Sequence, residues 1–319
     1  MSKLTLPIAK TKDEFWRFAD FESFSEKNFE KFLDKKNIIH ELKKSILNEE
    51  VFEGKLFEKI SLEKVNEINI EKSSEKIFFV DANVKKSFSQ KVFNAQINEN
   101  SKAQIYVSNT VCDDAFSQIE STIILQKNSE LKISIISDGE KKSLIYKKIN
   151  FVLEENSKLE LFVVELGDAK SRVEFSVKVL GKNADAKINA VVSCANNAFK
   201  DLRSFQIHDC ESSKSNLDLK CVLKDSAKCV FAGVVNVSKE SYDTKANQNC
   251  ACLLMSEKAT ICASPILEIE CMDVECAHGC AVSMPEKEQI FYMRSRGLSE
   301  EQAKDLISEG FASFEKALP

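Results

Sequence analysis

Glycine and proline are both scarce in this sequence. Only 8 glycines and 4 prolines occur in 319 residues, which disfavours folds built around glycine-rich loops that cradle phosphate groups. Neither a G-x-x-x-x-G-K-[ST] motif nor a G-x-G-x-x-G motif is present. The usual loops that hold ATP or NAD are therefore missing from the sequence.

Long apolar stretches are missing as well. No run approaches the ~18–20 apolar residues that cross a bilayer, and acidic side chains appear near the N-terminus before any apolar run long enough for a signal peptide. We therefore expect a cytoplasmic protein whose eleven cysteines are reduced thiols, since an odd number cannot pair completely within one chain.

The charge balance excludes two classes of partner. A formal net charge of −5 gives no general positive field, so neither nucleic acid nor an anionic membrane surface is expected to bind. Hydrophobic residues at 43% with charged residues at 30% are typical of a folded soluble protein rather than a disordered chain.

Residues 1–76 have the periodicity of helices. Phe15 and Phe18, and later Phe29 and Phe32, recur at the three-residue spacing of one helical face. We expect an N-terminal helical region whose aromatic side chains pack onto the rest of the protein.

A repeat follows, in which the hydrophobic period changes to two. Copies begin at Asn100, Asn128, Asn156 and Asn183, with starts separated by 28, 28 and 27 residues. A turn-forming asparagine followed by an alternating strand at fixed spacing is typical of a solenoid. We predict a parallel β-helix over residues 77–284, with about two strands in each turn of the coil.

Looser copies of the repeat begin at Lys224 and Ser256. A β-sandwich with evenly spaced hairpins is the alternative, but sandwich turns are usually richer in glycine and proline. The solenoid is therefore the favoured fold.

The chain returns to helical patterns over residues 285–319. Pro285 suits the first turn of a helix, and Gly297 fits just past the end of that helix. The segment from Ser299 to Gln302 has the sequence of a capping box and predicts a second helix. We therefore predict a C-terminal helical hairpin.

The densest group of potential ligands lies just before this hairpin. Cys276, His278 and Cys280 alternate along one predicted strand, so their side chains project from the same face. Thiolate and imidazole are donors that suit zinc, iron and iron–sulfur clusters. Same-face neighbours lie ~6.5–7 Å apart, so the group needs a partner surface to complete a site. We interpret Cys276 and His278 as metal ligands.

The other cysteines and histidines fit structural roles better. Cys271 is expected to face away from Cys276 unless a bulge intervenes. His208, beside Asp209, is interpreted as a hydrogen-bonded structural group, and His40 as a solvated one. Packing as small hydrophobic side chains accounts for Cys112, Cys194, Cys221 and Cys229, and is slightly favoured over ligation for Cys250 and Cys252.

No catalytic constellation can be identified. Neither a Ser–His–Asp set nor a paired-carboxylate motif can be located from the spacing of the residues. We expect no enzymatic activity and no catalytic residues.

Several motifs near the C-terminus follow one another in a characteristic order. They are Val230-Phe-Ala-Gly233, Leu253-Leu-Met, Pro265-Ile-Leu-Glu-Ile, Asp273-Val-Glu-Cys276-Ala-His278-Gly and Ile290-Phe-Tyr-Met-Arg294-Ser-Arg296-Gly297. Through them residues 199–314 resemble the SufB/SufD family of iron–sulfur cluster assembly proteins. The Pro-x-Leu-Glu-Ile and Cys-x-His-Gly runs are similar to those of its SufD branch, as is Thr11-Lys-Asp-Glu14-Phe-Trp16 near the start.

The resemblance implies a right-handed parallel β-helix between helical ends, in agreement with the repeat. It also implies a non-catalytic subunit that pairs with a SufB-like paralogue and joins a SufC-like ATPase. That ATPase would dock on the C-terminal helical region. The partner-interface residues implied there are Phe291, Tyr292, Arg294, Arg296 and Gly297.

The resemblance further implies a role for Cys276 and His278. Their positions would lie at the interface with the SufB-like chain, where iron or a nascent iron–sulfur cluster is held transiently and the partner brings the missing ligands. It hints at flavin binding by the whole complex, although no local motif here supports it. It leaves open whether the isolated chain forms a homodimer.

Some residues depart from the family pattern. Met272 replaces a common aspartate, and Cys250 and Cys252 stand where the family tends to have asparagines. A second hypothesis therefore stays open, that of a self-contained iron or iron–sulfur cluster carrier. An enzyme on a β-helix is least favoured, because no six-residue repeat is present. The carrier would use Cys250, Cys252, Cys271, Cys276 and Cys280.

Overall fold

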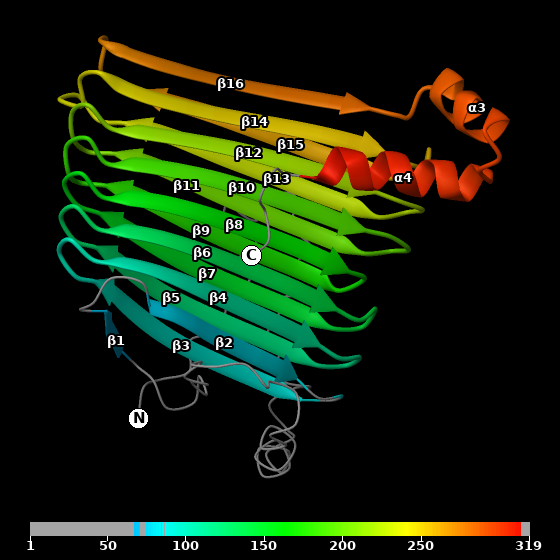
Figure 1. The fold of residues 1–319 in the computed structure, drawn as a ribbon, viewed down its shortest axis with the longest axis horizontal. Coiled ribbons are helices and arrows are strands. Elements are labelled where there is room, and N and C mark those ends of the chain that lie inside the picture. The colour runs from blue at the N-terminus through cyan, green and yellow to red at the C-terminus, as the bar shows by residue number, and fades with distance from the viewer. Residues whose placement is uncertain (1–66, 71–74, 84, 86, 314–319) are drawn as a thin grey trace, which may run out of the picture.

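Two parallel β-sheets, packed face to face, make up most of the protein (Figure 1). The structure is a computed structural model, and it describes residues 67–70, 75–83, 85 and 87–313. Successive strands alternate between the two sheets, and the paired strands run parallel. The predicted parallel β-helix with two strands per turn is confirmed, and the β-sandwich alternative is wrong.

Each strand pairs with the strands two positions before and after it in the chain. One sheet holds β1 (Glu67–Ile70), β3 (Phe88–Ile97), β5 (Phe116–Leu125), β7 (Leu144–Leu153), β9 (Lys170–Val179), β11 (Phe199–His208), β13 (Lys228–Val237) and β15 (Thr260–Ile269). The other holds β2 (Glu75–Asn83), β4 (Lys102–Val111), β6 (Glu130–Gly139), β8 (Lys158–Gly167), β10 (Asp185–Cys194), β12 (Lys214–Leu223), β14 (Thr244–Leu254) and β16 (Val274–Ser283).

The prediction of helices over residues 1–76 falls largely outside the described residues, and His40 falls there too. Where the structure does describe this segment, residues 67–70 and 75–76 are strand rather than helix. The two-residue period already begins at Glu67-Ile-Asn-Ile70, ahead of residue 77. The division of the chain into three domains stays a prediction.

Asparagines in the left-handed backbone conformation occupy the turns along one edge of the coil. Asn100, Asn128, Asn156 and Asn183 have φ values of 59°, 57°, 56° and 59°, a conformation that asparagine tolerates better than most residues. The Asn128 Nδ2 donates to Asn100 Oδ1 over 3.1 Å, and Asn156 donates to Asn128 in the same way. The repeated asparagine therefore sets the turn and also links it to the next rung.

The looser copies of the repeat do not continue this edge. Lys224 and Ser256 lie in the turns after β12 and β14, at the opposite edge of the coil. The asparagine edge continues instead with Ser212 and Asp243, which have φ values of 56° and 53° and are joined by a 3.2 Å hydrogen bond. The assignment was wrong because both edges use left-handed turns, as Asp225 with φ 52° shows.

The core lies between the sheets and is built from every second side chain. Phe93, Phe151, Phe175 and Phe231 are fully buried there, and burying a side chain of this size stabilises the fold by about 1.5–3 kcal/mol. Each rung covers the inward side chains of the rung beside it. Among the described residues, the strands at the ends of the coil have a neighbouring rung on one side alone.

Charged side chains also point into the coil. Lys91 Nζ lies 2.6 Å from Asp81 Oδ1, and Ser137 Oγ hydrogen-bonds both Lys147 and Glu165. Burial lowers the pKa of the Lys147 ammonium. These buried charges are tolerated because each has a polar partner.

Two helices follow the last strand, as predicted. They are α3 (Lys287–Ser295) and α4 (Glu300–Ala312), separated by Gly297 at φ 94°. The capping box of Ser299 and Gln302 is present, with hydrogen bonds of 2.8 and 3.1 Å. Pro285 precedes the N-cap Glu286 rather than standing in the first turn.

Helix α4 is tied back to the coil. Lys224 Nζ lies 2.6 Å from Asp305 Oδ1, and Lys220 Nζ donates to the Ser313 carbonyl over 2.5 Å. These contacts join the hairpin to β12 and the turn that follows it, so α4 lies across the coil near its last turns (Figure 1).

Candidate functional site

The C-terminal end of the coil is open. Strands β15 and β16 are the last members of their sheets, and β16 lies at the outer edge of the coil (Figure 1). Because no further rung follows among the described residues, inward side chains are exposed here, including Ile269 and Val282. The interior of the coil thus becomes a surface.

Cys276, His278 and Cys280 project from one face of β16, as predicted, and this face is the one that points toward the interior of the coil. In the parallel ladder Cys276, His278 and Cys280 lie opposite Ala246, Gln248 and Cys250 of β14. The β14 residues are buried in the interior, so the β16 residues continue the same inward rows to the open end. Cys276 is half-buried, whereas His278 and Cys280 are exposed.

Both thiols are held in their protonated form. Desolvation raises the pKa of Cys276, and desolvation together with Cys250 raises the pKa of Cys280 to about 11. A metal ion must therefore displace a proton to bind either sulfur, which makes binding stronger as pH rises.

Cys271 lies closer to this face than predicted. It sits in the turn between β15 and β16, is buried, and packs in one cluster with Val235 and Cys276. The strand alternation used to place it does not apply inside a turn, so the expectation that it faces away was wrong.

The donors that the structure describes do not form a closed metal site by themselves. Among the described residues, no three His, Cys, Asp or Glu side chains are placed so that they could hold a metal ion together. That Cys276 and His278 bind metal with ligands from another surface stays a prediction.

Gln248 is a residue of this end that the sequence analysis did not consider. Its side chain is 1% exposed, and neither amide atom has a hydrogen-bond partner among the described residues. It lies opposite His278 and reaches the space beside Gly233, where an added Cβ would be 2.5 Å from Gln248 Oε1. No signal in the sequence distinguishes it, because a glutamine on a strand is usually a solvated side chain.

The structural roles expected for His208 and for the other cysteines agree with the structure, except at Cys112. The His208 ring is buried and hydrogen-bonds the hydroxyls of Ser213 at 2.7 Å and Ser215 at 2.8 Å. Cys112 is only half-buried, because it lies in a turn at the edge of the coil. The thiols that are buried as predicted are Cys194, Cys221, Cys229, Cys250 and Cys252.

The hairpin presents a second exposed surface. Helix α3 has no buried residue, and Phe291 is 74% exposed although it is a large apolar side chain. The Arg296 guanidinium lies 5.3 Å from the Tyr292 ring centre, and Arg294 is 3.7 Å from Glu300. These contacts hold three of the predicted interface residues without burying them.

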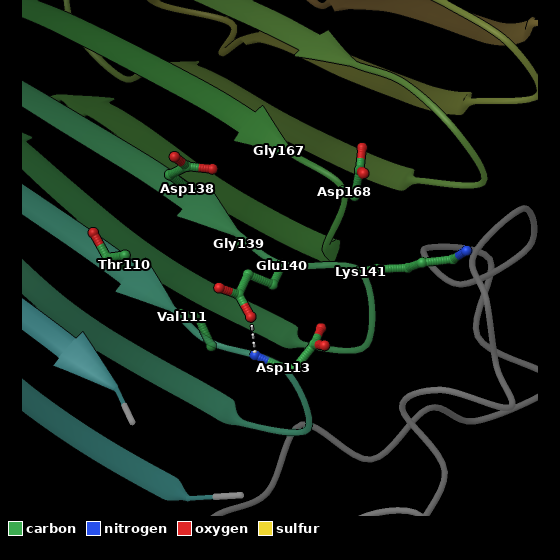
Figure 2. Close-up of a pocket in the computed structure, with 9 residues that line it drawn as sticks. All are labelled: Thr110, Val111, Asp113, Asp138, Gly139, Glu140, Lys141, Gly167 and Asp168. Carbon is green, nitrogen blue, oxygen red and sulfur yellow. Dashed lines mark hydrogen bonds between the residues drawn. The ribbon is translucent and has the colours of Figure 1, made fainter. Parts of the chain in front are cut away.

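A pocket of about 480 Å³ opens at the edge formed by the turns after β4, β6 and β8 (Figure 2). Its charged lining consists of four carboxylates and Lys141, and the backbone N–H of Asp113 donates to Glu140 over 2.8 Å. It contains none of the predicted site residues. Its oxygen donors alone define no reaction.

No helix in the described part of the chain is long and apolar enough to cross a membrane.

The fold and its open end define a class of protein, a parallel β-solenoid that presents thiol and imidazole donors beside a helical hairpin. Residues 78–311 match the family described as "SUF system FeS cluster assembly, SufBD core domain". The chain therefore belongs to the SufBD family of iron–sulfur cluster assembly proteins, which confirms the resemblance drawn from the motifs.

Individual relatives agree with this assignment. The chain is 33% identical over 138 residues to iron-sulfur cluster assembly protein SufD of Escherichia coli K12, a match that covers 43% of this chain and 33% of the relative. It is 33% identical over 138 residues to the chloroplastic protein ABCI7 of Arabidopsis thaliana, covering 43% and 29%. The matches span about a third or less of the length of these relatives.

Proposed function

We propose that the chain is a non-catalytic scaffold subunit of a SUF-type iron–sulfur cluster assembly complex. In this role iron or a nascent cluster is a cargo held transiently by Cys276 and His278 together with ligands from a partner chain. The observation that carries the proposal is that His278 is exposed and Cys276 half-buried at the last strand, where the described residues supply too few ligands for a metal ion.

The partner that fits the open end is a SufB-like paralogue. Strand β16 is the terminal strand of its sheet, and such an edge offers unpaired backbone groups to a further strand. Apolar side chains of the last rung, including Ile269 and Val282, accompany it. A second coil that docked here would bury these side chains and bring donors opposite His278.

The second partner, a SufC-like ATPase, would dock on the helical hairpin. Exposed Phe291 and Tyr292 offer apolar contact area, and Arg294 and Arg296 offer charge. Gly297 allows the sharp turn between the two helices. Because α4 is bonded to the coil through Asp305, movement of the hairpin would be passed to the last rungs.

The proposed complex works in the cytoplasm, where its thiols stay reduced. Flavin binding is assigned only to the complete complex, and no described residue is proposed to hold the flavin.

The competing hypothesis is a self-contained carrier that uses five cysteines of this chain. Cys271 packs with Cys276, whereas Cys250 and Cys252 contact each other in the buried interior. The five thiols therefore do not meet at one place, which favours the scaffold. Anaerobic purification of the isolated chain separates the two functions, since a carrier retains stoichiometric iron and a scaffold does not.

The test of the scaffold is co-expression with the candidate paralogue and ATPase. We expect a stable complex, and a Cys276→Ser/His278→Ala variant that still joins the complex but assembles less cluster. Cys112→Ser is the matched control, because Cys112 lies at the edge of the coil. Failure of the wild-type chains to co-purify, or an unchanged cluster yield in the double variant, contradicts the proposal.

A further inference from the structure

A second group of sulfur atoms lies inside the coil, apart from Cys276 and His278. Two of its members project inward from β12 and β13, and two from β14. An exposed fifth thiol, from β16, reaches the open end. The group, called here the interior thiols, consists of Cys221, Cys229, Cys250, Cys252 and Cys280.

The interior thiols contact one another in sequence. Cys250 and Cys252 have their Sγ atoms 3.5 Å apart, and Cys221 and Cys229 have theirs 4.0 Å apart across the coil. Cys252 lies opposite Cys221 on the neighbouring strand, and Cys250 lies opposite Cys280. A continuous row of sulfur atoms therefore leads from the surface at Cys280 to the buried pair Cys221 and Cys229.

The donor set is soft, but its sulfur atoms are not placed to surround a zinc ion. Its members are thiols only, with the apolar Leu219 and Phe231 among their buried neighbours in the core. Structural zinc requires four ligands, and no group of three or more donors is placed for a metal ion among the described residues. Two sulfur atoms on opposite walls suit a two-coordinate soft ion instead, and thiolates select Cu(I) among such ions.

One buried lysine stands in register with the ligand pair. A bis-thiolate Cu(I) unit carries one negative charge, which is costly to bury alone. Lys200 is buried opposite Cys229 on the neighbouring strand, and its Nζ donates to the Leu166 carbonyl over 2.8 Å.

We propose that the interior thiols form a Cu(I)-binding site, with Cys221 and Cys229 as its ligand pair and the other three as the path of entry. Binding joins one Cu(I) ion to two sulfur atoms and releases their two protons, with no change of oxidation state. The ion is passed from Cys280 through Cys250 and Cys252 by exchange of one thiolate ligand for the next. This site does not depend on the assembly role of Cys276 and His278.

The test is an anaerobic titration of the full chain with Cu(I) in competition with a chromophoric chelator. We expect one Cu(I) ion per chain, and an affinity lowered in Cys221→Ser by more than the about 10- to 100-fold that loss of an outer-shell partner costs. The Cys276→Ser/His278→Ala variant and the control Cys112→Ser should keep the wild-type affinity. If Cys221→Ser does not fold, Cys229→Ser takes its place.

X-ray absorption at the copper edge gives a second readout on the unmodified chain. We expect sulfur neighbours only and a low coordination number. Nitrogen in the first shell, loss of binding in the Cys276→Ser/His278→Ala variant, or no retention of Cu(I) against the chelator would overturn the proposal. The co-expression test of the scaffold would be unaffected by any of these results.

Discussion

Gln248 lies opposite His278 on the neighbouring strand; Gln248 is buried with an amide that has no hydrogen-bond partner in the part of the chain that the structure describes, and His278 is exposed at the open end. An unpaired buried amide destabilises a fold by about 1–3 kcal/mol. Its position on the strand next to the imidazole points to a functional reason for keeping this destabilising amide. We expect the amide to hydrogen-bond His278 when a partner covers this end, and so to fix the orientation of the ring.

Replacing Gln248 with methionine should separate stability from function. Gln248→Met keeps a similar side-chain shape but removes the unpaired amide, so the free energy of unfolding of the isolated chain should rise by about 1 kcal/mol. Cluster assembly by the complex should fall, because the ring of His278 loses its support. Chemical denaturation and cluster yield measure the two effects. A less stable variant with full cluster yield would contradict this account.

Gly233 is needed to make room for the same amide. A Cβ at this position would lie 2.5 Å from Gln248 Oε1 and 2.7 Å from Phe231 Cζ, so Gly233→Ala should destabilise the fold by about 1–3 kcal/mol. Part of this loss should return in Gly233→Ala/Gln248→Ala, since the two sites are in contact. Gly310→Ala is the control, because nothing lies within 4 Å of its added Cβ, and it should stabilise α4 by about 1 kcal/mol. Equal effects of the two glycine substitutions would be the contrary result.

The asparagine edge can be tested at Asn128. The Asn128→Ala change places alanine at φ 57° and removes hydrogen bonds to Asn100 and Asn156, so it should cost about 1–2 kcal/mol of unfolding free energy. Asn128→Gly removes the side-chain bonds but accepts the backbone conformation, and it should cost less. Thermal or chemical unfolding ranks the two variants. A glycine variant less stable than the alanine variant would show that the turn conformation is not the main requirement.

His208 should make stability depend on pH. Burial lowers the pKa of its imidazole from 6.5 to about 4 in the folded chain, so the unfolded chain binds the proton more readily. As pH is lowered from 6.5 to about 4, protonation of His208 in the unfolded chain should therefore reduce the free energy of unfolding by ~3 kcal/mol. Above pH 6.5 this group should contribute no pH dependence. In His208→Gln that part of the pH dependence should disappear. An identical slope in variant and wild type would contradict the assignment.

The fold was predictable because each copy of its repeat is defined by residues that are close together in the sequence. Asparagine at left-handed turns and alternation along each strand are both visible in the sequence, and the shared face of Cys276 and His278 follows from that alternation. Cys271 was misplaced because alternation fails within a turn. The interior polar groups were not recognised, since Lys147 or Gln248 at an inward position is indistinguishable by residue type from a solvated side chain.

The sulfur row was not predictable for a different reason. Each interior cysteine could be assigned to the core from its own segment, but the contact of Cys221 with Cys229 depends on how opposite walls of the coil meet. Contacts between strands of different sheets are set by the tertiary packing, and the spacing of residues along the chain does not encode them directly.

Alkylation of thiols in the isolated chain and in the co-purified complex tests the central claim most directly. If the open end is the docking surface for the paralogue, Cys280 and Cys276 should react with iodoacetamide in the isolated chain and be protected in the complex, while Cys112 reacts equally in both. Equal labelling of Cys280 in the two states, measured by mass spectrometry, would show that the partner does not cover this end.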